Sequence, residues 1–201
     1  MMKKNIALVL ALVLTVGVCA QAYFVENHSF EEPGTGKLTN WESVPGWSSD
    51  IVAVDSGVES DWPGSTDGVY AGYLMAGDPP VLQLTSTQIA AGEEYTLIVD
   101  ARDNWTESGP AVLGMMLYYD LDGFKMPVAV DFKELTGGWQ TYSLSWNSSA
   151  APGAVGKEIG IAFANVSSPN SWIGIDNVRL IPEPASLLLL GVGGLLIRRR
   201  R

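Results

Sequence analysis

The sequence predicts an all-β domain built as a two-layered sandwich or jelly roll. Apolar residues alternate with polar or small ones over short runs, which is the period-2 pattern of strands with one wet face. Pairs of Gly, Pro, Asn and Asp separate nearly all of these runs and supply turns. Outside the two ends of the chain, no helical period exceeds two turns. Short strands with regularly spaced turns are typical of sandwiches and jelly rolls.

Nine short strands are expected. The clearest alternation places Tyr142, Leu144 and Trp146 on one face of a strand, with Thr and Ser residues on the other. The Asp122-Gly123 pair predicts a hairpin tip and not a calcium loop, because no Glu stands where such a loop would end. In chain order the expected strands are residues 51–55, 69–75, 81–84, 94–101, 111–119, 128–132, 141–146, 159–163 and 172–180.

Length and charge limit the possible partners. The chain has 201 residues, enough for one ordinary domain with its own core. Its net charge of −10 argues against nucleic acid as a partner, since phosphate contacts need clustered Lys and Arg. Six of the 12 basic residues lie at the two ends of the chain. We therefore divide the chain into residues 1–22, an acidic domain at 23–180 and a tail at 181–201.

The N-terminus predicts a signal peptide. Lys3 and Lys4 precede an apolar run, and residues 20–22 (AQA) fit the small-x-small pattern that signal peptidase cleaves; residues 18–20 are a second possible site. An uncleaved anchor is the alternative, but the run is short for a membrane span. A lipoprotein signal at Cys19 is disfavoured because Val18 stands where a small residue is needed. The domain is therefore expected to cross the inner membrane.

The C-terminus has three unlike features in fixed order: a Pro-Glu-Pro motif, a short apolar stretch that ends at residue 197, and an Arg cluster. This order resembles the PEP-CTERM sorting signal of Gram-negative bacteria. The resemblance implies a short transmembrane helix as a transient anchor, cleavage near the motif by an exosortase, and a place at the cell surface or in an extracellular biofilm matrix. Similar tails also occur on ice-binding-type surface proteins. The signal comprises Pro182, Glu183, Pro184, Arg198, Arg199, Arg200 and Arg201.

Four landmarks in the middle domain resemble carbohydrate-binding-module jelly rolls of the galactose-binding-like type. They are an opening VENHSFE at residues 25–31 with VPGW at 44–47, AGEEYTL at 91–97, GWQTY at 138–142 and IDNV at 175–178. The resemblance implies that 25–31 forms the first strand and that it lies near the last. It covers nearly the whole domain, and this family includes sugar binders as well as domains without a known ligand.

The resemblance also implies a structural Ca²⁺ held by Glu31 and Asp176. Ca²⁺ prefers oxygen ligands, and an exported domain without disulfides gains stability from such a link. Glu26 or Glu32 would substitute for Glu31 if the register differs. The alternative is that these acids are ordinary solvated residues at strand ends.

Two tryptophans in polar, turn-rich stretches are candidate ligand contacts. Trp62 follows Asp61, and Trp105 follows Asn104. An exposed indole beside a carboxylate or amide is the arrangement with which lectin-like sites hold sugars. Loop tryptophans that fold back onto a sheet edge are the alternative. Trp47, Trp139 and Trp146, by contrast, are expected in the core.

The sequence indicates a non-catalytic protein of the cell envelope or matrix, with carbohydrate or exopolysaccharide as its possible ligand. His28, the one histidine, is expected in the first strand, and no nucleophile elbow surrounds any Ser. A polysaccharide hydrolase is the alternative, since two positioned carboxylates among many acids would suffice for it.

Overall fold

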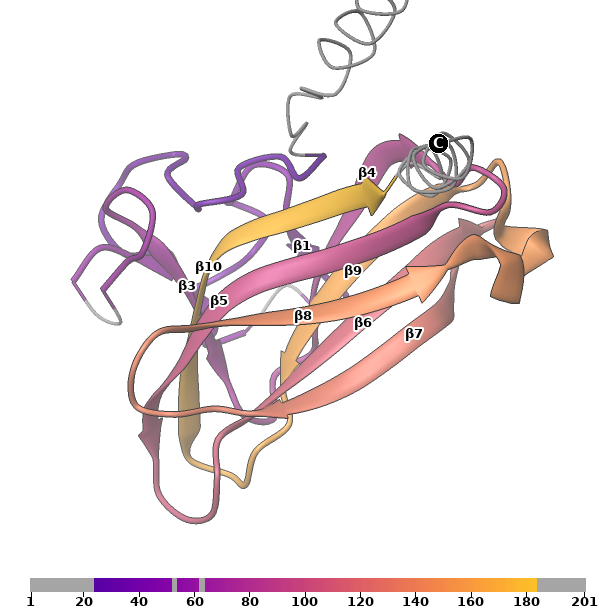
Figure 1. Cartoon of the computed structure of the whole chain (residues 1–201). Helices are drawn as coiled ribbons and strands as arrows, with labels where there is room; N and C mark the ends of the chain where they lie inside the picture. Colours follow the sequence, from indigo (N-terminus) through magenta and orange to yellow (C-terminus); the bar gives the residue numbers. More distant parts are fainter. Residues whose placement is uncertain (1–23, 52–53, 62–63, 184–201) are drawn as a thin grey trace, which may run out of the picture.

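The computed structural model describes residues 24–51, 54–61 and 64–183. Within these ranges the chain forms ten strands in two five-stranded sheets, which confirms the predicted β-sandwich of the jelly-roll type (Figure 1). Two short 3-10 turns, Ser148–Ala150 and Pro152–Ala154, follow β8. The strands are β1 (Ser48–Ser49), β2 (Gly57–Glu59), β3 (Ala71–Met75), β4 (Val81–Gln88), β5 (Glu94–Thr106), β6 (Val112–Leu121), β7 (Phe124–Glu134), β8 (Gln140–Asn147), β9 (Glu158–Asn165) and β10 (Ser171–Glu183).

Sheet I has the strand order β1-β4-β9-β6-β7, and sheet II has the order β2-β3-β10-β5-β8. Neighbouring strands in both sheets are antiparallel. The sheets pack face to face because alternate residues of each strand are apolar and point inward. Leu97 and Val99 of β5 enter the core from one side, and Ile161 and Phe163 of β9 enter it from the other; all four have no exposed surface.

An aromatic cluster closes the core near the start of the domain. The ring centroids of Phe30 and Trp47 lie 5.1 Å apart, and Trp47 lies 6.3 Å from Phe163 of β9. Trp41 packs 6.0 Å from Phe30 and is fully buried. Such rings bury large apolar areas and add a specific pair geometry. The sequence predicts Trp47 in the core and gives no such indication for Trp41.

Eight of the nine predicted strands correspond to β3–β10. The expected strand at 51–55 is wrong for its described part: residue 51 is a bend, and residues 54 and 55 lie outside any strand. In place of that strand, two hydrogen bonds from Ser56 to Asp78 hold this part of the chain. The backbone N–H and the hydroxyl of Ser56 both donate to Asp78 Oδ2, at 2.8 and 2.5 Å.

The expected first strand at 25–31 is also wrong, because Asn27 turns the chain. Asn27 Nδ2 donates to the carbonyl of Glu32, and Asn27 Oδ1 accepts the Glu32 N–H, both at 3.0 Å. Asn27 and Phe30 have positive φ values of 47° and 59°, which a strand does not allow. His28 therefore lies in a turn.

The opening segment is nevertheless held against both sheets. Gln83 of β4 accepts the Glu26 N–H at 2.8 Å and donates to the Glu26 carbonyl at 3.0 Å. The Val178 N–H of β10 donates to the His28 carbonyl at 2.9 Å. The expected closeness of residues 25–31 to the last strand is therefore confirmed, although it arises from turns.

The β6–β7 hairpin has the predicted tip. Asp122 and Gly123 separate the two strands and have φ values of 54° and 87°. Positive φ at both central residues is the geometry that favours Asp-Gly in two-residue hairpin turns. The predicted signal peptide at 1–22 and the apolar stretch of the tail lie outside the described residues. Across the described ranges, no helix is long and apolar enough to span a membrane.

Candidate functional site

Two carboxylates from separate parts of the chain hold residues 66–70, which we call the clamped segment. Glu31 Oε1 accepts the backbone N–H groups of Val69 and Tyr70, each at 2.7 Å. Asp176 Oδ2 accepts those of Thr66 and Asp67, at 2.6 and 2.9 Å. The two carboxylates thereby accept four of the five backbone N–H groups of residues 66–70, two on each side of Gly68.

Asp176 follows the core residue Ile175 in β10 and therefore lies on the outer face of sheet II, opposite Asp100 of β5. Thr66 Oγ1 lies 3.1 Å from both Asp100 Oδ2 and Asp176 Oδ2. Asp176 has no exposed surface, and this burial raises its pKa to about 6, although hydrogen bonds from Thr66, Asp67 and Asn177 act in the opposite direction. Asp176 is therefore a carboxyl that titrates near neutral pH.

Asp100 is also well supplied with donors. It accepts the Thr141 hydroxyl at 2.6 Å and Asn177 Nδ2 at 3.0 Å. Arg179 Nη2 lies 3.8 Å from Asp100 Oδ1. The outer face of sheet II thus carries a compact acidic network around Asp100 and Asp176. The sequence did not predict that Asp100 belongs to it.

The predicted calcium ligands therefore meet at the clamped segment. Both carboxylates face it, as a cation shared with the loop would require. Each already accepts two backbone N–H groups there, however. Among the residues that the structure describes, no group of three or more His, Cys, Asp or Glu side chains could hold a metal. Calcium at Glu31 and Asp176 stays a prediction.

Of the predicted ligand contacts, Asn104 and Trp105 lie near the end of β5. Trp105 of β5 pairs with Trp172 of β10 and has 50% of its surface exposed. Asn104 sits at the bulge beside it; its Oδ1 and Nδ2 are shielded from solvent and have no hydrogen-bond partner among the described residues. Asp61 is exposed, and Trp62 lies outside the described residues. A shared ligand site for these four residues stays a prediction.

Two of the three tryptophans expected in the core are buried there. Trp47 and Trp146 have 4% and 7% of their surface exposed. Trp139 precedes β8 and is only partly buried, with the guanidinium of Arg102 5.9 Å from its ring. Its expected place in the core is wrong because it flanks the strand and faces a charged side chain.

The outer face of sheet I is unusual because it is apolar. Leu113, Met115 and Leu117 of β6 point into the core, so Gly114, Met116 and Tyr118 point outward. On β9 the outward residues are Gly160, Ala162 and Ala164. A sheet with one solvated face ordinarily places polar residues at such positions. None of these six positions carries a charged side chain, and only Met116 and Ala164 among them are more than slightly exposed.

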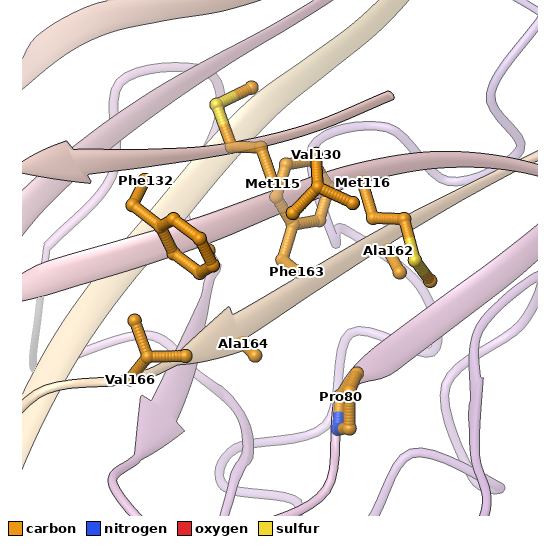
Figure 2. A pocket seen from close by; sticks show the side chains of 10 residues that line it. Pro80, Met115, Met116, Val130, Phe132, Ala162, Phe163, Ala164 and Val166 are labelled. Atoms are coloured by element: carbon orange, nitrogen blue, oxygen red, sulfur yellow. The ribbon is translucent and has the colours of Figure 1, made fainter. Parts of the chain in front are cut away.

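A shallow groove lies across this face (Figure 2). Glycine and alanine form its floor on β6 and β9, while Val130 and Phe132 of β7 rise beside it with 51% and 61% of their surface exposed. None of the lining side chains is titratable or hydrogen-bonding. The lining residues are Pro80, Gly114, Met115, Met116, Val130, Phe132, Ala162, Phe163, Ala164 and Val166.

Tyr118 adjoins the groove at the next position along β6. Its ring lies on Gly160, where an added Cβ would come within 2.1 Å of Cζ. Tyr118 packs with Leu82, Ala162 and Met116 in a small cluster of its own. Burial, together with the carboxylates of Asp120 and Asp50, raises its phenol pKa to about 12. The phenol is therefore neutral at physiological pH.

The predicted sorting signal begins inside the fold. Pro182 pairs with Tyr95 and Glu183 with Glu94, so both belong to the end of β10. Pro184 and the residues from Arg198 to Arg201 lie outside the described residues. The motif therefore starts where the sandwich ends.

Comparison with known families gives two matches. Residues 21–181 match the HpiC1-like family, described as HpiC1 cyclase. Residues 180–201 match the PEP-CTERM protein-sorting motif, which confirms the predicted C-terminal signal and implies secretion to the cell envelope or surface. No match is found among curated proteins.

Solved structures with a similar fold include cyclases and carbohydrate-binding modules. A cyclase from Fischerella sp. TAU in complex with 4-(1H-indol-3-yl)butan-2-one is 20% identical, with a TM-score of 0.59 over 80% of this chain and 96% of that one. The CBM22-1 xylan-binding domain of Paenibacillus barcinonensis Xyn10C is 14% identical, with a TM-score of 0.52 over 77% and 91%. A CBM4 structure is 19% identical, with a TM-score of 0.51 over 79% and 99%. These likenesses confirm the jelly-roll fold and carry no activity with them.

The groove is not predicted from the sequence, although one signal for it is present. The alternation at 159–163 places small residues where a wet face would carry Ser, Thr or Lys. Small residues on two adjacent central strands leave room above a sheet, but their adjacency depends on the β6–β9 pairing. That pairing joins residues about 45 positions apart, so it cannot be read from local pattern.

Proposed function

The chain belongs to the HpiC1-like family, and on that premise we propose that it is an exported surface protein whose sandwich binds a compact apolar ring compound in the groove of sheet I. The observation that carries the proposal is the composition of the groove: every lining side chain is apolar, and its floor is glycine and alanine. A flat floor between raised Phe and Val side chains suits a planar ring. Ligand pockets are typically apolar with few polar groups.

The composition of the groove disfavours a sugar as its ligand. Sugar hydroxyls that lose water need hydrogen-bond partners, and an unpaired one costs free energy. The lining side chains supply none. The cyclase from Fischerella sp. TAU, whose crystal structure contains an indole ketone, supports a ring compound as the ligand class by its likeness of fold.

Binding without catalysis is the form of the proposal that the groove supports. Proton transfer in catalysis needs a positioned acid or base, and the lining residues include none. The titrating carboxyl of Asp176 lies on the other sheet. Because the family is described by a cyclase, cyclisation of a bound compound is the alternative, and product analysis after incubation with a ligand decides between the two.

The two ends of the chain set its location in this proposal. The signal peptide at 1–22 is removed by signal peptidase, and the tail hands the protein to an exosortase. The tail helix anchors the protein in the membrane only until cleavage. Support comes from the PEP-CTERM match at residues 180–201.

Calorimetry with matched variants tests the groove. Gly114→Val fills it without backbone strain, because a Cβ at this position meets Val166, Ala164 and Phe132 only at 3.4–3.6 Å. Gly137→Val is the control, with open space around its Cβ. We expect wild type and Gly137→Val to bind indole and Gly114→Val to lose binding at least tenfold. Equal binding by all three would refute the groove as the site.

Carbohydrate binding is a second candidate, favoured by the half-exposed indole of Trp105 beside the unpartnered amide of Asn104. In this alternative, exopolysaccharide binds at Trp62, Trp105, Asp61 and Asn104. A surface-polysaccharide array with Trp105→Ala and Trp62→Ala tests it. Binding retained by both variants would remove these residues from the site, and release of reducing ends would instead identify a hydrolase.

A further inference from the structure

An ion pair joins the two opposite edges of sheet I. Lys125 lies in β7, one edge strand, and Asp50 directly follows β1, the other. Lys125 Nζ nevertheless lies 2.7 Å from Asp50 Oδ1. Strands β4, β9 and β6 separate these edges, and in a flat sheet they would lie about 19 Å apart. Asp50 lies in a bend beyond the end of β1, so the curl of the sheet and the path of the chain after β1 together bring the two side chains into contact.

The pair crosses the outer face of the sheet. Lys125 is directly opposite Asp120, which points outward because its neighbour Tyr119 packs against the core. A bulge in β7 at Val128, between the pairs that β7 makes with Leu117 and Tyr118, adds a bend there. The ion pair, which we call the strap, is thus formed over the concave outer face.

Tyr118 and its neighbours lie beneath the strap. Asp120 stands two residues from Tyr118 on the same face of β6, and Asp50 is paired with Lys125 directly opposite Asp120; both carboxylates help to raise the pKa of Tyr118. Leu82, Tyr118 and Ala162 sit on the outer face, yet each has only 2–3% of its surface exposed. Further along the same face, Val130 and Phe132 are open to solvent. The apolar face therefore has a covered half and an open half, and the groove is the open one.

Ala162 and Met116 belong to both halves, because they line the groove and also pack with Tyr118. The covered half is thus a direct continuation of the groove. At its far end the Tyr118 hydroxyl has no hydrogen-bond partner among the described residues, so it is a donor available to a ligand that reaches it. An apolar ligand with a hydrogen-bond acceptor at one end would fit the full length.

We propose that the Lys125–Asp50 strap determines ligand length by closing the covered half of the groove. This inference rests on the proposed function, since it assigns specificity to the same groove. With the strap closed, the open half admits a compact ring. With it broken, a longer ligand extends over Ala162 and Met116 to the Tyr118 hydroxyl. The strap is weak, because its side chains are 34% and 58% exposed, and salt screens such pairs.

A pair of ligands and a matched pair of variants test the strap by calorimetry. Indole is the short ligand, and 4-(1H-indol-3-yl)butan-2-one is the long one with a carbonyl acceptor. Lys125→Ala breaks the strap. Lys133→Ala is the control, since it removes the same charge from the same strand and breaks the Lys133–Asp131 pair instead. We expect Lys125→Ala to bind the long ligand more tightly, by about fourfold for each additional buried methylene, with indole affinity unchanged.

Two further arms complete the test. Asp50→Lys combined with Lys125→Glu rebuilds the pair with reversed charges and should restore wild-type selectivity. High salt should raise the ratio of long-ligand to short-ligand affinity in wild type and leave it constant in Lys125→Ala. The same long-to-short ratio in Lys125→Ala and Lys133→Ala would overturn the proposal.

A readout without ligand separates the strap from the groove. Tetranitromethane nitrates accessible tyrosines, and peptide mapping gives the rate at Tyr118. The strap predicts faster nitration of Tyr118 in Lys125→Ala than in Lys133→Ala. If wild type binds neither indole compound, the proposed function fails, and the nitration rates still decide whether the strap covers Tyr118. Equal rates would show that it does not.

Discussion

Gly68 shows how one residue decides whether the clamped segment can form. Its φ is +85°, and an added Cβ would lie 2.3 Å from Glu31 Oε1. Gly77 has a similar φ of +98° with nothing within 4 Å of its Cβ. Both glycines thus have a positive φ, and only the added Cβ of Gly68 would meet a neighbouring side chain.

Gly68→Ala should therefore destabilise the fold more than Gly77→Ala. Both variants incur the backbone cost, on the order of 1–3 kcal/mol, and Gly68→Ala in addition displaces the Glu31 carboxylate from two N–H groups. Urea unfolding measures the difference. Equal losses would mean that Glu31 gives way at no cost and contributes little to the clamp.

The pKa of Asp176 gives a pH dependence with a definite sign. The folded value is about 6, whereas an unfolded Asp has about 3.9. The folded state therefore holds the proton more tightly, so stability from this group is full below about pH 4 and is lost as pH rises through about 6. The loss is at most about 3 kcal/mol. Urea unfolding at pH 4.5 and 7.5 in chelator should show it.

Asp176→Asn should remove this part of the pH dependence, and the exposed Asp61→Asn should not. Asn cannot titrate, and its one oxygen still accepts the N–H groups of Thr66 and Asp67. An unchanged slope in Asp176→Asn would assign the pH dependence to other acids.

Calcium makes a separate prediction at the same residues. Chelation should lower the melting temperature by roughly 5–11 °C if free Ca²⁺ stands 100-fold above its dissociation constant, which is worth about 2.7 kcal/mol. Asp176→Asn should abolish that response. Melting curves that superimpose with and without chelator would leave Glu31 and Asp176 as a clamp for backbone N–H groups alone.

At the scale of single residues, the sequence predicted that Glu31 and Asp176 lie close together but did not predict the groups that they bind. Glu31 and Asp176 do reach the same segment. Their observed partners are backbone N–H groups of residues 66–70. The directions of these N–H groups depend on the geometry of the turn and cannot be inferred from the side chains of the two acids. The buried Asp100 could not be foreseen, because its donors come from the distant residues Thr141 and Asn177.

At the scale of elements, alternation located most strands, because burial of one face imposes it. It failed at 51–55, and the strand that the resemblance implied at 25–31 does not form because Asn27 satisfies the backbone locally and so competes with a strand. It underestimated the end of β5, since Asn104 sits at a register shift that interrupts the period.

The close approach of β9 to the Tyr118 ring yields a prediction for the groove face. Gly160→Ala places a Cβ 2.1 Å from Tyr118 Cζ and should cost about 1–3 kcal/mol. Gly114→Ala, on the adjacent strand, meets its neighbours at 3.4 Å or more and should be nearly neutral. In combination with Tyr118→Ala, the cost of Gly160→Ala should largely vanish. Persistent cost in the double variant would show that Tyr118 does not occupy the space above Gly160.

At the scale of the whole molecule, the two candidate functional regions lie on opposite sheets. Sheet II carries the acidic network and the clamped segment, and sheet I carries the apolar groove. The end of β10 joins the sandwich to the sorting tail. A single cut near the Pro-Glu-Pro motif would therefore separate the folded domain from its sorting signal, provided that the cut leaves β10 intact.

That boundary makes processing measurable. Protein from the native envelope should begin near Gln21 or Tyr23 and end between Pro182 and Pro184, and intact-mass measurement would show it. A cut at this point keeps the β10 pairs up to Ile181–Thr96 and the fully buried Leu180. A chain that ends at residue 183 should therefore melt like the full-length protein, whereas one that ends at 179 should lose about 2–5 kcal/mol with Leu180. A main envelope species that still carries Arg201 would contradict cleavage and make the tail a permanent anchor.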